Sequence, residues 1–136
     1  MPDRANVLAA IDSAYAAREA GDKEALARHF APFATFHIVG RKELLGFDVG
    51  PVDAMSAIGE LIDLFTFHRV ERLHVAIDGS VAMVHLRIEV STAGGARETT
   101  ELCDVWTFDD DAKFRSIVEF GDTGLITHML AGAAGA

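Results

Sequence analysis

The run Val81-Ala-Met-Val-His-Leu-Arg-Ile-Glu-Val-Ser91 is the strongest structural signal in the chain, because apolar residues occupy every second position. Such alternation, rich in β-branched residues, predicts a strand with two unlike faces. One face is uniformly apolar and carries Ala82, Val84, Leu86, Ile88 and Val90. The opposite face carries Val81, Met83, His85, Arg87, Glu89 and Ser91. Charged side chains are costly to bury unless they are paired, so we expect the charged face to carry the chemistry.

The residues before this strand predict three helices. Helical spacing of apolar residues predicts the first over 7–20, with Asp3 or Asn6 as N-cap and Gly21 as the end. The second covers residues 23–30, and the third follows Asp53 and ends near Phe65. Between the last two we expect a short strand over residues 33–39 and a loop over residues 40–51.

The second half of the chain predicts a β meander. Turn residues separate four strands, expected over residues 67–77, 81–91, 98–108 and 114–120, and a short final helix is expected from Thr123. Helices followed by antiparallel strands indicate one α+β domain over residues 1–136. The helices can cover only one face of this sheet. We therefore expect the apolar face from Ala82 to Val90 to lie outside and to form a homodimer through the outer sheet face.

Composition excludes several classes of function. The chain has 136 residues and a formal net charge of −9, which disfavours binding to nucleic acid or to an anionic membrane surface. The single Cys103 cannot form an internal disulfide, and no histidine or cysteine pair has the spacing of metal ligands. No apolar run reaches membrane-spanning length and no signal peptide is evident, so we expect a cytoplasmic protein without cofactor or metal.

Three segments, in this order of elements, carry a resemblance to a known family. They are Gly21-Asp-Lys-Glu-Ala-Leu-Ala-Arg-His-Phe30, Asp104-Val-Trp-Thr-Phe-Asp-Asp-Asp-Ala-Lys-Phe114 and Ile117-Val-Glu-Phe-Gly-Asp122. Together they resemble the nuclear transport factor 2-like superfamily, and most of all its SnoaL-like proteins. The resemblance implies a cystatin-like cone, in which a curved antiparallel sheet wraps around three N-terminal helices and leaves a pocket at its open end. Members include ketosteroid isomerase, polyketide cyclases and limonene epoxide hydrolase, so the fold alone does not specify a reaction.

One set of candidate residues follows from the resemblance to limonene epoxide hydrolase. That enzyme uses Arg-x-Asp on one strand and a further Asp on the last strand, and the matching positions here are Arg87-Ile88-Glu89 and Glu119. However, Phe36 and Ile38 fall where that enzyme has the Tyr and Asn that hold its water, and neither can form a side-chain hydrogen bond. We therefore do not assign epoxide hydrolysis, and a structural ion-pair network is an alternative role for these charges.

Further candidates lie on other elements. Asp104 is in phase with Leu102 and Trp106, and in the isomerases and cyclases of the superfamily one pocket Asp removes the proton next to a carbonyl. His37 and His85 are candidates for acid–base catalysis because a free imidazole titrates at about pH 6.5. Tyr15 lies where ketosteroid isomerase has its first-helix Tyr, although core packing with one hydrogen bond also explains it.

These observations together predict a small-molecule enzyme. We expect general acid–base isomerisation, cyclisation or hydration of an apolar compound bearing a carbonyl or epoxide, without a cofactor. Its polar groups would be Asp104, Arg87, Glu89, Glu119 and His37, with Tyr15 and His85 as further ligand contacts. The expected apolar lining is Phe30, Phe33, Phe36, Ile58, Ile62, Phe65, Leu102 and Trp106. The alternative is a non-catalytic ligand-binding or dimeric interaction protein on the same fold.

Overall fold

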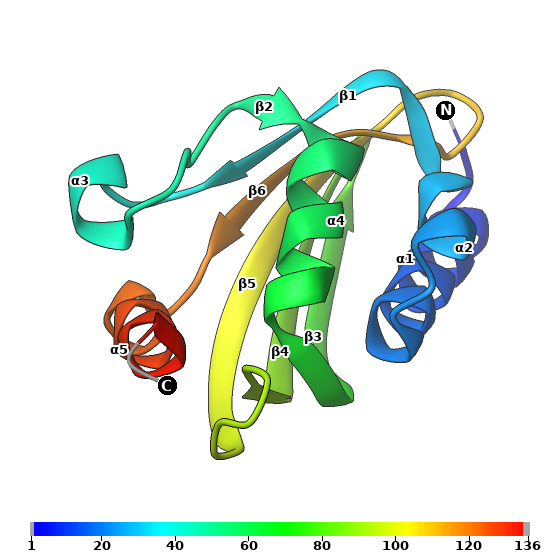
Figure 1. The fold of residues 1–136 in the computed structure, drawn as a ribbon. Coiled ribbons are helices and arrows are strands. Elements are labelled where there is room, and N and C mark those ends of the chain that lie inside the picture. Colours follow the sequence, from blue (N-terminus) through cyan, green and yellow to red (C-terminus); the bar gives the residue numbers. More distant parts are fainter. Residues whose placement is uncertain (1, 135–136) are drawn as a thin grey trace.

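Helices and strands follow the predicted order in the structure, a computed structural model that describes residues 2–134 (Figure 1). The helices are α1 (Arg4–Ala20), α2 (Lys23–Ala27), α3 (Lys42–Leu45), α4 (Ala54–Leu64) and α5 (Thr123–Ala134). The strands are β1 (Phe30–Ile38), β2 (Val52–Asp53), β3 (Thr66–Asp78), β4 (Val81–Ser91), β5 (Glu98–Phe108) and β6 (Phe114–Phe120). They form one six-stranded sheet in the order β2-β1-β6-β5-β4-β3, in which β1 and β6 are parallel and the other pairs antiparallel. The α+β prediction is confirmed.

Local sequence signals explain most of the boundaries. Asp3 is the N-cap of α1 and accepts a hydrogen bond from the backbone N–H of Asn6 at 3.0 Å, while Gly21 ends the helix in the left-handed conformation. Asp53 caps α4 in the same way through Ser56. Two expectations were wrong in detail. The second helix stops at Ala27 because the chain enters β1 by Phe30, and the loop over residues 40–51 contains α3.

The orientation of β4 is opposite to the expected one. Its apolar residues from Ala82 to Val90 are buried on the inner face, which α1 and α4 cover (Figure 1). Arg87 and Glu89 point outward, where each pairs with a charged neighbour on the sheet surface. The expectation of an outer dimer face from Ala82 to Val90 was therefore wrong. Burying the apolar face removes more hydrophobic surface from water, whereas the charged residues remain solvated at little cost.

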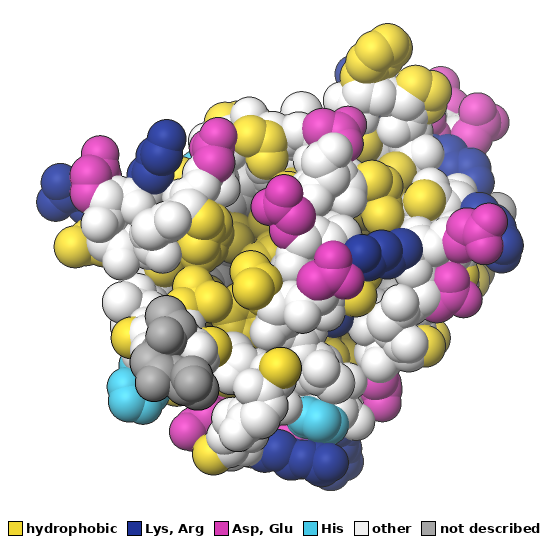
Figure 2. All heavy atoms as spheres, viewed as in Figure 1, with side chains coloured by type: hydrophobic (Ala, Val, Ile, Leu, Met, Phe, Trp, Pro, Cys, Tyr) yellow, Lys and Arg dark blue, Asp and Glu magenta, His cyan; other side chains and the backbone are white. Residues whose placement is uncertain are grey.

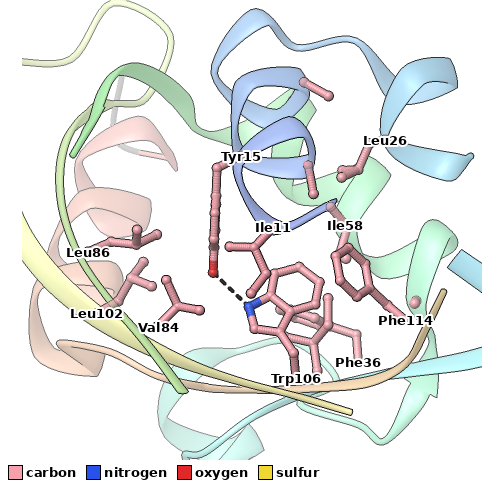
Figure 3. Packing of buried hydrophobic residues seen from close by; sticks show 14 of the residues in the cluster. Ile11, Tyr15, Leu26, Phe36, Ile58, Val84, Leu86, Leu102, Trp106 and Phe114 are labelled. Carbon is pink, nitrogen blue, oxygen red and sulfur yellow. Dashed lines mark hydrogen bonds between the residues drawn. The ribbon is translucent and has the colours of Figure 1, made fainter. Parts of the chain in front are cut away.

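Aromatic side chains fill the core beneath the helices (Figure 3). The rings of Trp106 and Phe114 lie 4.0 Å apart between centroids, and Phe30 packs against both. Leu86 and Leu102 continue this core along β4 and β5, which fixes the inner face of the sheet as one wall of the cavity described below. Within residues 2–134, none of the helices has the length and hydropathy needed to cross a membrane.

Candidate functional site

A cavity of about 110 Å³ lies between the inner face of the sheet and helices α1, α4 and α5. Figure 2 shows hydrophobic side chains in a hollow between α4 on one side and α3 and α5 on the other. Its walls are mainly aliphatic and aromatic, with a few polar side chains among them. Four of these come from three elements and form the candidate site, namely Tyr15, Arg18, Asp104 and Glu119.

Asp104 and Glu119 are direct cross-strand partners on β5 and β6, so both side chains face the cavity. Asp104 is only 4% exposed. Burial, and then the negative charge of Glu119, raise the pKa of Asp104 well above its ordinary value. Burial also raises the pKa of Glu119, but contact with Asp104 and the positive charge of Arg18 oppose that rise. The two carboxyl groups therefore titrate together as a pair.

A hydrogen-bonded chain from α1 fixes the Asp104 carboxyl. The Tyr15 hydroxyl donates to Asp104 Oδ2 at 2.6 Å. The same oxygen accepts a hydrogen bond from Trp106 Nε1 at 2.9 Å (Figure 3). Burial, and then the charge of Asp104, raise the pKa of Tyr15 well above its ordinary value, so the hydroxyl stays protonated. Asp104 Oδ1 is buried, and the Asp104 carboxyl also interacts through a side-chain hydrogen bond with Glu119. This shared hydrogen bond joins the two carboxyl groups of the site.

Arg18 belongs to the candidate site although it was not among the residues expected from the sequence. The residue borders the cavity. Burial lowers the pKa of Arg18 to about 10, and the negative charge of Glu119 opposes this lowering. The signal was present in the sequence. Arg18 continues the spacing of Val7, Ile11 and Ala14, and this pattern places a cation on the buried face of an otherwise apolar helix.

The expected cavity residues divide into two groups. Those that line the cavity are Tyr15, Phe30, Phe36, Ile58, Phe65, Leu102, Trp106, Asp104 and Glu119. The catalytic or binding role of each remains a prediction. The cavity also includes apolar residues on the face of β4 that we expected to lie outside, namely Leu86, Ile88 and Val90. The sequence showed that these residues alternate with polar ones. It did not show on which side of the strand the helices pack.

The other expected site residues lie away from the cavity, and their predicted placement was wrong. Arg87 is 3.7 Å from Glu71, and Glu89 pairs with Arg97 at 3.0 Å, on the outer face of the sheet. His85 shares that face, where it contacts Glu101 and His74.

His37 is the register partner of Val118 on the outer face, and its Nδ1 bonds to the carbonyl oxygen of Val49 at 2.8 Å. Phe33 is 96% exposed at an irregularity of β1, where its φ of 63° turns the side chain outward. Ile62 packs against the core without lining the cavity. No group of three His, Cys, Asp or Glu residues in the described chain is arranged to hold a metal ion.

Comparison with known proteins supports the fold. Residues 11–128 match the model of the SnoaL-like domain. Many solved structures have similar folds, and three of them serve as examples. An LEH-like epoxide hydrolase from M. tuberculosis has 15% sequence identity and a TM-score of 0.72, and the match covers 98% of this chain and 96% of that chain. BvnE pinacolase from Penicillium brevicompactum has 16% identity and a TM-score of 0.75, with 98% and 94% covered.

The third is SalBIII, an epoxide hydrolase/cyclase-like enzyme of pyran ring formation in the polyether salinomycin. It has 22% identity and a TM-score of 0.72, with 90% of this chain and 95% of that chain covered. No curated protein matches the chain. At these identities the structural matches establish the fold alone, whereas the domain model covers most of the sequence. The chain belongs to the SnoaL-like domain family.

Proposed function

We propose that this protein is a cofactor-free acid–base enzyme that isomerises, cyclises or hydrates an apolar compound bearing a carbonyl or an epoxide. One observation supports it above the others: Asp104 and Glu119 face the same apolar cavity as direct partners, and burial raises the pKa of each. Two interacting carboxyl groups can divide the roles of acid and base between them. The similar folds of an epoxide hydrolase and a cyclase-like enzyme are consistent with this class of chemistry.

The two carboxyl groups would have opposite roles. Asp104, which was expected from the sequence to be the base, would be the acid, and Glu119, whose ionised form the positive charge of Arg18 favours, would be the base. With a carbonyl substrate, Glu119 takes the proton from the neighbouring carbon, and the electron pair of that C–H bond forms an enol whose oxygen receives the proton of Asp104. With an epoxide, Glu119 takes a proton from the attacking water or hydroxyl group as the C–O bond of the ring breaks. The released oxygen then takes the proton of Asp104.

Tyr15 would act as a positioning residue. Its hydroxyl donates a hydrogen bond to Asp104 Oδ2 and so fixes the Asp104 carboxyl beside Glu119 at the cavity wall. Because Trp106 in turn holds the Tyr15 oxygen, the acid is fixed before any ligand arrives. Such preorganisation lowers the reorganisation needed during reaction.

The test is a panel of enones, ketones and epoxides, assayed with the wild type, Asp104→Asn and Glu119→Gln. We expect each variant to lose at least about a hundredfold in kcat, the usual contribution of a positioned acid or base. Glu60→Gln, an exposed carboxylate of α4, is the matched control and should be unaffected. Turnover that survives in both variants would exclude this role. A wild type that binds compounds of the panel but turns over none would favour the non-catalytic ligand-binding alternative.

We also propose that two copies associate through the outer face of the sheet. A row of apolar residues crosses this face in register, formed by Ala76 on β3, Met83 on β4, Val105 on β5 and Val118 on β6. Met83 is 53% exposed, although it is a large apolar side chain. Contact with the same row of a second copy would remove this surface from water.

A further inference from the structure

Arg18 is a buried cation without a carboxylate in contact. Its side chain is 8% exposed, and within residues 2–134 no Asp or Glu forms an ion pair with it. Nη2 donates to the carbonyl oxygens of Phe65 at 3.0 Å and Leu61 at 3.4 Å. Cζ lies 3.7 Å from the centroid of the Phe67 ring. A buried charge is costly unless it is compensated, and these neutral groups compensate only part of it.

The neutral contacts orient the guanidinium but do not use all its donors. Both hydrogen bonds come from Nη2, and no hydrogen bond joins Nε or Nη1 to another residue of the described chain. Leu61 and Phe65 lie at the C-terminal end of α4, where the carbonyl groups and the helix dipole attract a cation. Because Arg18 borders the cavity, its remaining N–H groups are available to a molecule bound there. The planar fork of an arginine matches the two oxygens of a carboxylate.

We propose that Arg18 is an anion-binding residue of the cavity, and that the ligand is an apolar acid whose carboxylate binds the guanidinium. The inference rests on the proposed function in one respect, since it names the substrate class of the same site. The aliphatic and aromatic walls would hold the body of such an acid. Its reactive carbon or oxygen would then lie toward Asp104 and Glu119, which border the same space.

Glu119 is the charged group that competes with this ligand. It interacts electrostatically with Arg18, although the two form no ion pair. A bound carboxylate is therefore attracted by the guanidinium and repelled by Glu119. Removing the charge of Glu119 should strengthen binding of the acid, whereas removing that of Arg18 should weaken it. A general loosening of the cavity would change the affinity for the acid in the same direction in both variants. Changes of opposite sign would therefore indicate recognition of the ligand's charge.

The experiment compares phenylacetate with phenylacetamide, which has nearly the same shape but no charge, by calorimetry or NMR titration near neutral pH. The wild type should bind the acid at least about tenfold more tightly than the amide. Arg18→Met should remove that preference and leave affinity for the amide within about threefold, because methionine preserves much of the apolar stem. Arg18→Lys should retain part of the preference, and Glu119→Gln should increase it. Arg28→Met, at an exposed arginine, is the matched control.

Equal affinity of the wild type for acid and amide would overturn the inference, and this measurement requires no variant to fold. A folded Arg18→Met protein that still prefers the acid would also overturn it. Because the titration measures binding without turnover, the role of Arg18 and the proposed catalytic function can fail separately. Acid preference without any catalytic effect of Asp104→Asn would refute the proposed function alone. Turnover that depends on Asp104, without acid preference, would refute the role of Arg18 alone.

Discussion

At the scale of single residues, the buried carboxyl of Asp104 links stability to pH. Burial, and then the charge of Glu119, raise the pKa of Asp104 well above its ordinary value. A carboxyl group whose pKa is higher in the folded than in the unfolded chain destabilises the fold increasingly as the pH rises from the unfolded to the folded pKa. Asp104→Asn cannot ionise and keeps a similar shape. We expect its free energy of unfolding to exceed that of the wild type by on the order of 1 kcal/mol at mildly alkaline pH, and by less at mildly acidic pH. Urea unfolding at both pH values measures the difference, and a difference that does not change with pH contradicts the prediction.

The hydroxyl of Tyr15 supports two buried polar groups at once. Tyr15→Phe leaves both Asp104 Oδ2 and Trp106 Nε1 without this partner. We expect a loss of about 2 kcal/mol in the free energy of unfolding, measured by chemical denaturation, because buried groups left unsatisfied lose their full hydrogen-bond stabilisation. Thr107→Val removes a hydroxyl from a half-buried hydrogen bond to Ser116 and should cost less. Equal losses in the two variants would show that the Tyr15 network adds nothing beyond an ordinary hydrogen bond.

Residue patterns predicted part of this site and missed part of it. Asp104 was evident because an acid stood between Leu102 and Trp106 on an alternating strand, and burial of that face follows from its neighbours. Arg18 was missed because helical spacing shows that a cation shares the buried face but does not show which carbonyl groups hold it. Leu61 and Phe65 approach it only in the folded chain, and this long-range contact leaves no mark in local sequence.

At the scale of elements, strand boundaries were easier to predict than strand orientation. The bounds of β4, β5 and β6 match the expected ones, because turn residues mark each end. Alternation in β4 predicts two faces, but it does not say which of them the helices cover. Placing its charges inward was wrong because hydrophobic burial outweighs any gain from pairing Arg87 and Glu89 inside the fold.

The C-terminal helix α5 closes one side of the cavity with Leu125, Ile126 and Met129. Asp122 begins this helix, since its Oδ1 accepts a hydrogen bond from the N–H of Leu125 at 3.0 Å. We expect Asp122→Ala to cost about 1 kcal/mol and to speed amide hydrogen exchange within residues 123–134 while exchange in α4 stays unchanged. Asp53→Ala removes the corresponding cap of α4. This variant should speed exchange within α4 and leave exchange within residues 123–134 unchanged. Uniformly faster exchange after Asp122→Ala would mean that α5 does not open as a separate unit.

At the scale of the whole molecule, the outer face of the sheet carries apolar residues that the helices do not cover. The sequence predicted an outer dimer face but assigned it to Ala82 and its neighbours, because the side on which the helices pack was not known. The register instead brings Met83, Val105 and Val118 together in one row of that face. Surrounding charges such as Arg87 and Glu71 would form the rim of an interface centred on this row.

The proposed association can be tested by placing a charge in that row. A lysine at the centre of an apolar interface would have to lose its hydration without gaining a partner, so we expect Met83→Lys to weaken association at least about tenfold. Sedimentation of the wild type over a range of concentrations should show twice the monomer mass, and the variant should shift toward the monomer. Leu64→Lys is the matched control, because Leu64 is 47% exposed on α4, away from the sheet face, and should leave association unchanged. A wild type that remains monomeric at high concentration would refute the dimer, and equal effects of the two lysines would place the interface elsewhere.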